Sequence, residues 1–148
     1  MAGETILVFG TEKVLEANGG SCVNAAIVQA NDATYGIVAD GAYFPDADFV
    51  LRCQWATITN IENKTIDLYA RDLNIDGTND AIAPTATYLH RYIGAFKISA
   101  VAANTDQYIK LTANNVPKEA EYYLLNSSGQ TISAGWTLKV TPRSRKSA

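Results

Sequence analysis

The sequence predicts an all-β protein, an antiparallel sandwich or barrel with at most one short helix. Several segments alternate apolar and polar residues with a period of two, which is typical of half-buried strands. Turn-forming pairs such as Asp40-Gly41 and Asp76-Gly77 separate these segments, and the four prolines lie outside strand centres. Many short strands between such turns indicate a sandwich or a barrel of antiparallel strands.

The alternating segments are residues 48–58, 65–71, 91–99, 106–112 and 132–141. The last is the cleanest, because Trp136, Leu138 and Val140 lie in one apolar row. Trp55 lies in phase with the apolar row of the first segment. Both tryptophans are therefore predicted to pack in the core.

Two segments have less regular patterns. In 91–99, the period of two puts Tyr92 in the same row as Phe96. In 21–30, the alanines allow a short helix capped by Ser21, and a strand is the alternative.

The chain has 148 residues, the usual size of one domain that folds without a metal or a disulfide. We predict a single β-sandwich domain over residues 1–142. Residues 143–148 then form a basic C-terminal tail that contains Arg143, Arg145 and Lys146. Alone such a tail is a frayed terminus, whereas on an oligomer it is an arm that reaches a neighbour.

The charge argues against a nucleic-acid partner, since the net charge is −3. The distribution is uneven: residues 1–80 hold twelve acids and four bases, a net of −8, and residues 81–148 hold three acids and eight bases, a net of +5. In a sandwich these halves either cancel in space or form two faces of opposite sign, which suits head-to-tail contacts. No apolar run approaches the ~18 residues of a membrane helix, so no membrane partner is expected.

Cys22 and Cys53 are the two cysteines. The first residues do not resemble a signal peptide, which predicts folding in a reducing cytoplasm. Both thiols are therefore expected to be free, with Cys53 buried in its strand.

The loop 72–80 has the sharpest local pattern. Its oxygen-bearing residues resemble the start of a calcium loop, with weak candidate ligands Asp72, Asn74, Asp76 and Asp80. The twelfth position is Ala83, where that motif needs a bidentate Glu. The favoured interpretation is a polar loop held by hydrogen bonds from Asp and Asn side chains, with no metal and no cofactor.

Catalytic patterns are weak, and the prediction is that the protein is not an enzyme. His90 is the only histidine and lies among strand residues, where a hydrogen-bonded structural role is favoured over a Ser–His–Asp site. The acid pairs are Asp46 with Asp48 and Glu119 with Glu121, and nothing distinguishes them from surface carboxylates.

Eight tyrosines and a charged content of only 18% favour a surface that a partner covers. Tyr69 lies on the outer row of its strand, and adjacent Tyr122 and Tyr123 put one ring on each face. With their neighbours and the tail, the interface candidates are Tyr69, Arg71, Tyr122, Tyr123, Arg143, Arg145 and Lys146.

The strand-and-turn sequence of residues 43–52, 65–80, 92–96 and 129–142 resembles capsid decoration, or cement, proteins of tailed, podovirus-like bacteriophages. The resemblance implies a jelly-roll-like sandwich on the outer capsid surface. It also implies two partners, the major capsid protein and further copies of the chain in a dimer or trimer. The alternative is a carbohydrate-binding module or an adaptor on a phage tail or fibre.

Overall fold

A computed structural model describes residues 4–56 and 64–147 of the chain. Within these ranges the chain forms nine strands and no helix, which confirms the predicted all-β class. No helix capable of crossing a membrane occurs in the described part. The strands are β1 (Thr5–Phe9), β2 (Lys13–Gly19), β3 (Ile27–Tyr35), β4 (Asp46–Cys53), β5 (Thr65–Asp72), β6 (Tyr92–Lys97), β7 (Gln107–Ala113), β8 (Ala120–Ser127) and β9 (Trp136–Ser147).

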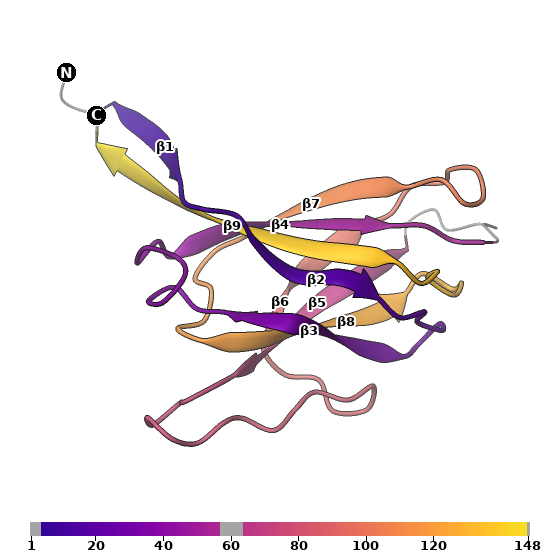
Figure 1. The fold of residues 1–148 in the computed structure, drawn as a ribbon, viewed down its shortest axis with the longest axis horizontal. Coiled ribbons are helices and arrows are strands. Elements are labelled where there is room, and N and C mark those ends of the chain that lie inside the picture. The colour runs from indigo at the N-terminus through magenta and orange to yellow at the C-terminus, as the bar shows by residue number, and fades with distance from the viewer. Residues whose placement is uncertain (1–3, 57–63, 148) are drawn as a thin grey trace.

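The strands form two antiparallel sheets that pack face to face (Figure 1). One sheet has the order β1-β9-β4-β7, and β2 pairs with the same edge of β9 as β1 does, nearer the start of β9. The other sheet has the order β3-β8-β5-β6. This is the sandwich that the sequence predicts.

The topology is that of a jelly roll. The pairs β2–β9, β3–β8, β4–β7 and β5–β6 are nested, as they are when one long hairpin is folded over. Rolling this hairpin brings β4 beside β9 and β5 beside β8, which completes the two sheets. The expected jelly-roll-like sandwich is therefore confirmed.

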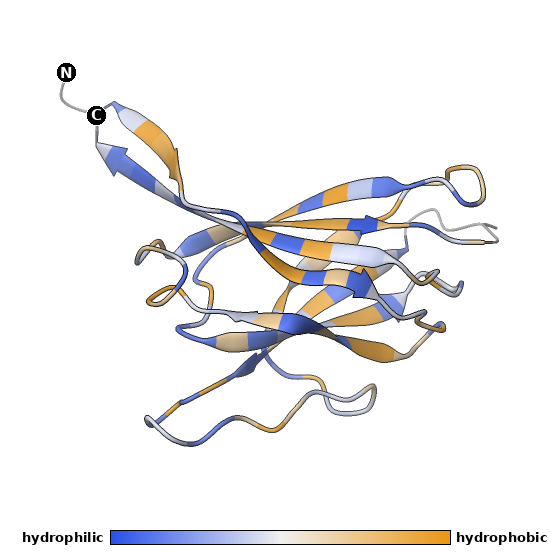
Figure 2. Cartoon of the chain, viewed as in Figure 1, coloured by the Kyte–Doolittle hydropathy of each residue, from blue (hydrophilic) through white to orange (hydrophobic). Residues whose placement is uncertain are grey.

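The core lies between the sheets and consists of the inward row of each central strand. The alternation is visible along the strands in Figure 2. The predicted inward rows of β4, β5 and β9 are confirmed, including both tryptophans. The largest fully buried side chains are Trp55, Trp136, Tyr35, Tyr122, Phe49, Phe96, Leu15, Leu51, Ile66, Leu68 and Leu124.

Residues 21–30 follow the strand alternative. The chain turns at Ala25, whose φ is +65°, and then enters β3 at Ile27. Asn126 of β8 fixes this turn: its carbonyl accepts the Ala25 N–H at 2.8 Å, and its side-chain amide donates to the Cys22 carbonyl at 2.9 Å. These bonds satisfy the backbone without a helix.

The predicted pairing of Tyr92 with Phe96 in one row is wrong. Phe96 is buried, whereas Tyr92 is exposed. The register of β6 against β5 shifts between Leu68 and Tyr69, so the partners change from Gly94 directly to Tyr92. One additional residue at a bulge interrupts the period of two.

Residues 143–147 are not a frayed tail, because they continue β9 and pair with β1. The predicted domain boundary at residue 142 is therefore wrong. Pro142 does not end the strand, since it lies between the last pair with β2, at Val140, and the first pair with β1, at Arg143. A missing N–H is tolerated where a strand exchanges one neighbour for another.

We predict that Trp136→Ala destabilises the protein by about 3–5 kcal/mol, because a buried indole leaves a large cavity. Trp136 is 1% exposed, and its Nε1–H donates to the Gly20 carbonyl at 2.8 Å. Denaturant unfolding measures the change. Tyr108→Ala is the matched control, since Tyr108 is 72% exposed and its loss should cost under about 0.5 kcal/mol. Equal stability of the two variants would contradict this packing.

Candidate binding arm and its surroundings

The most distinctive surface feature is a two-stranded arm, formed by β1 and residues 143–147 of β9. Its register runs from Phe9 opposite Arg143 to Thr5 opposite Ser147. The pairing of β9 with β4 ends at Arg143, so in the described residues the arm beyond that point has no third strand. Figure 1 shows the arm projecting beyond the end of the sandwich.

The arm exposes apolar side chains. Ile6, Leu7 and Phe9 are 50%, 46% and 53% exposed. Ile6 and Leu7 are adjacent, so they lie on opposite faces of the strand. Figure 2 shows that β1 is the apolar strand of the arm and the end of β9 is the polar one. A lone two-stranded ribbon is marginally stable in water, and an exposed apolar edge is a template for association.

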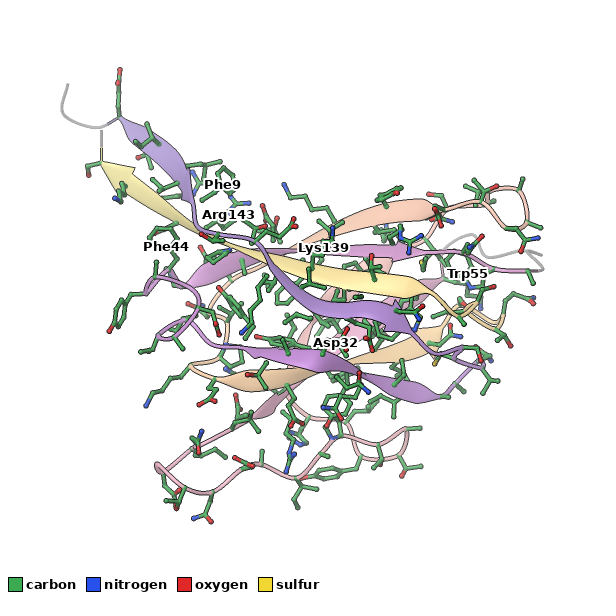
Figure 3. The ribbon with its side chains drawn as sticks, in the orientation of Figure 1. Phe9, Asp32, Phe44, Trp55, Lys139 and Arg143 are labelled. Atoms are coloured by element: carbon green, nitrogen blue, oxygen red, sulfur yellow. The ribbon has the colours of Figure 1, made fainter. Side chains whose placement is uncertain are left out.

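An ionic cluster fixes the base of the arm. The Arg143 Nη1 lies 3.1 Å from an Asp48 carboxylate oxygen, and Lys110 Nζ lies 3.3 Å from the other oxygen. Burial alone would raise the pKa of Asp48, but hydrogen bonds from Thr112, Arg143 and Lys110 outweigh it and lower that pKa. The ionised Asp48 thus orients Arg143, which lies beside Phe9 at the base of the arm (Figure 3).

The other two cations of the predicted tail lie further out on the arm. Arg145 and Lys146 are exposed, and among the described residues no ion pair joins either of them to an acid. Their charges remain available to a partner. The predicted interface residues Arg143, Arg145 and Lys146 therefore share one structural element.

The other four interface candidates lie in the second sheet, one of them in the core and three on its outer face. Tyr122 lies in the core with its ring centroid 5.1 Å from that of Phe49, so its prediction as an interface residue is wrong. Alternation assigned Tyr122 and Tyr123 to opposite faces but did not show which face is internal. Tyr123 is on the outer face, yet it is only 7% exposed and donates to Glu121 at 2.9 Å.

Tyr69 and Arg71 lie on the same outer face as Tyr123. Tyr69 is opposite Tyr123 in the register and makes an edge contact with Tyr92, at 5.4 Å between ring centroids. Arg71 pairs with Glu121 at 3.2 Å and donates to the Ala81 carbonyl at 2.7 Å. Arg71 therefore holds the long segment after β5 against this sheet, which is a structural role.

The loop 72–80 is held by its own hydrogen bonds, as the favoured interpretation predicts. One Asp76 oxygen accepts the N–H groups of Thr78 and Asn79, at 3.1 and 2.8 Å. The pKa of Asp76 is lowered to about 2, chiefly by hydrogen bonds from Asn79 and Thr78. Asp80 accepts the Asn74 N–H at 3.0 Å.

The remaining weak calcium candidate, Asp72, faces Arg91 at 3.6 Å. In the described part of the chain, no group of three or more His, Cys, Asp or Glu side chains is placed to hold a metal. The arrangement of this loop thus rests on contacts with the chain's own amides and guanidinium groups.

Potential nucleophiles and bases are engaged or buried. The His90 Nε2 lies 2.7 Å from the Ile82 carbonyl oxygen. Cys22 and Cys53 are free thiols, as predicted, and both are buried. Burial, with Asp106 nearby, raises the pKa of Cys53 to about 12, and burial raises that of Cys22. Both thiols therefore remain protonated at neutral pH.

A groove of about 290 Å³ crosses the outer face of the sheet that contains β9. It is lined by Glu12, Val50, Arg52, Tyr108, Thr137 and Lys139. Arg52 and Lys139 already have partners, since Arg52 donates to the Gly135 carbonyl at 2.6 Å and Lys139 lies 3.8 Å from Glu12. Tyr108 presents an exposed ring beside these polar groups. Alternation in 106–112 puts Tyr108 in the same row as Lys110 but does not reveal the groove.

A carboxyl pair that no sequence pattern indicated is formed by Glu16 on β2 and Asp32 on β3. Glu16 is only 5% exposed, and Asp32 accepts the Ala17 N–H at 2.7 Å. Burial and the neighbouring Asp32 raise the pKa of Glu16, whereas the Ala17 N–H and Glu16 lower that of Asp32. The pair joins strands of different sheets, so spacing along the chain gives no signal for it.

Comparison with known protein families, with curated proteins and with solved structures finds no match to this chain.

We predict that Glu16→Gln raises the melting temperature near pH 7 and that the gain disappears below about pH 4. The raised pKa means that protonation of Glu16 stabilises the folded state. This contribution is present below the unfolded pKa and is lost as pH rises. Gln is neutral at every pH and can donate to Asp32. Calorimetry across pH measures the difference, and a gain that persists unchanged at pH 3 would contradict the claim that ionisation of Glu16 destabilises the fold.

Proposed function

We propose that this chain is a structural protein of a tailed bacteriophage particle, bound in many copies to the outer capsid surface, where it cements major capsid protein subunits. The proposal begins with the sequence resemblance to capsid decoration proteins. The jelly roll is compatible with it, because this architecture serves viral capsid proteins and also lectins. The fold is therefore compatible with a capsid protein but does not distinguish it from a lectin.

The projecting arm is the observation that carries the proposal. A cementing protein needs contact area outside its own fold, and the arm offers Ile6, Leu7 and Phe9 with two cations beside them. Apolar contact supplies the free energy of binding, and the cations select an acidic partner surface. Repetition over a lattice multiplies weak contacts through avidity.

A binding role is favoured over catalysis by the state of the reactive groups. His90 is engaged by a backbone carbonyl, and the two thiols are buried and neutral. The carboxylate of Asp48 is occupied by Thr112 and Arg143. Catalysis would need such groups to be accessible and free to react, whereas here they are held by structural contacts or buried.

Quantification of the protein in purified phage particles tests the proposal. We expect many copies per particle, released together with the capsid shell and labelled by antibodies on the outside of the head. A variant without residues 144–148 should remain folded yet attach poorly, since β1 then loses its described partner strand. Absence from particles, or a few copies confined to the tail, would overturn the proposal.

Carbohydrate binding is the second candidate, favoured by one observation, the exposed Tyr108 beside the polar groove. Sugar rings stack on such aromatic faces while charged and hydroxyl groups bind their oxygens. Glycan-array binding that disappears in Tyr108→Ala would support this candidate. The arm truncation should leave such binding intact, which separates the two functions.

A further inference from the structure

In the described part of the chain, exposed large apolar side chains gather most densely in two separate regions. The first is the arm. The second is the segment 73–92, which runs from the end of β5 to the first residue of β6 and is called here the receiving segment; in it Ile75 and Ile82 are 65% and 70% exposed. Tyr88, Leu89 and Tyr92 of the same segment are also exposed. Clusters of this kind mark interaction sites more often than isolated exposed side chains do.

The receiving segment borders a hollow that an apolar side chain can enter. The hollow has a volume of about 260 Å³, and its lining consists of Asp72, Leu73, Asn74, Ile75, Arg91, Lys118 and Glu119. Leu73 and Ile75 supply an apolar wall, and Glu119 is held at the rim by Asn74 at 2.8 Å. The hollow is therefore concave, and the hydrogen bond between Asn74 and Glu119 holds its rim in place.

The two regions carry opposite charge. The arm with its preceding residue has three bases, Arg143, Arg145 and Lys146, and one acid, Glu4, a net of +2. Around the receiving segment there are five acids and three bases, a net of −2: Asp72, Asp76, Asp80, Glu119 and Glu121 against Arg71, Arg91 and Lys118. Asp76 retains its charge because its pKa is about 2. The arm and the receiving segment are therefore complementary in charge, and both expose apolar side chains.

The arm cannot contact the receiving segment of its own molecule. Figure 1 shows the arm beyond one end of the sheet that contains β9, and the long segment between β5 and β6 on the far side of the other sheet. The base of the arm is fixed by Arg143 and Asp48. A complementary contact must therefore form between two molecules.

We infer that the arm of one copy docks on the receiving segment of a second copy, with apolar side chains of β1 against Leu73 and Ile75 and with Arg145 and Lys146 facing its acids. The contact joins two different surfaces. It forms either reciprocally in a twofold dimer or successively around a ring. The inference concerns the free protein and does not depend on the capsid proposal.

Size-exclusion chromatography with light scattering on the full chain tests the docking. We expect a discrete oligomer for the unmodified protein. The arm variant Arg145→Glu with Lys146→Glu should associate at least about tenfold more weakly, because its arm is then acidic like the segment. The segment variant Thr78→Lys with Ile82→Lys should weaken association by a similar factor, because the segment loses its negative net charge and the apolar side chain of Ile82. All four residues are exposed, and the substitutions keep the Asp76 turn. Mixing the two variants should restore association, since the acidic arm of one then meets the two introduced lysines of the other.

The matched control is Lys64→Glu with Lys97→Glu, which makes the same charge change at the other end of β5 and should leave the oligomer unchanged. Three results would each overturn the inference: a monomeric unmodified protein, an arm variant that still associates, or two variants that fail to combine. A segment variant that associates normally would also overturn it, because the arm would then bind another surface. Absence of the protein from phage particles would refute the capsid proposal and leave this result standing.

Discussion

The whole structure depends on the continuous backbone pairing of β9. This strand has twelve residues, which span about 40 Å. Along one edge it pairs with β4, and along the other it pairs first with β2 and then with β1. Its inward row, anchored by Trp136, holds the core of the sandwich, and its last residues create the arm. One strand therefore links stability to the surface that we propose for binding.

The arm extends the sheet beyond the sandwich, and its direction is fixed at its base. Arg143 is held by Asp48 at the last position where β4 still supports β9. Beyond that position, apolar side chains and two cations extend outside the sandwich without a third strand in the described residues. A partner that supplies such a strand or an apolar surface would remove both the exposed edge and the exposed side chains from water. The exposed edge and the exposed side chains of the arm are the basis of the proposed role in assembly.

The sequence was sufficient for features that depend on local periodicity. The inward rows that contain Phe49, Ile66 and Trp136 follow from alternation alone. The arm does not, because β1 and the end of β9 are separated by almost the whole chain, and residues 143–148 read alone as a polar terminus. The carboxyl pair of Glu16 and Asp32 has the same non-local origin.

Other errors arose where alternation is ambiguous or interrupted. A period of two separates Tyr122 from Tyr123 but does not identify the inner face, and the bulge opposite Leu68 and Tyr69 changes the phase of Tyr92. The three cations of the predicted tail do lie together on the end of β9, but nothing in the sequence indicates that β1 lies beside them. The apolar partner strand is what changes a basic terminus into a candidate binding element.

Hydrogen exchange of the arm tests the central claim most directly. Backbone amides of residues 5–9 and 144–147 should exchange rapidly in the dilute, free protein, because a lone ribbon opens readily. In the assembled protein, the same amides should become protected while those of β4 and β8 change little. Assembly that leaves exchange in the arm unchanged would contradict the account.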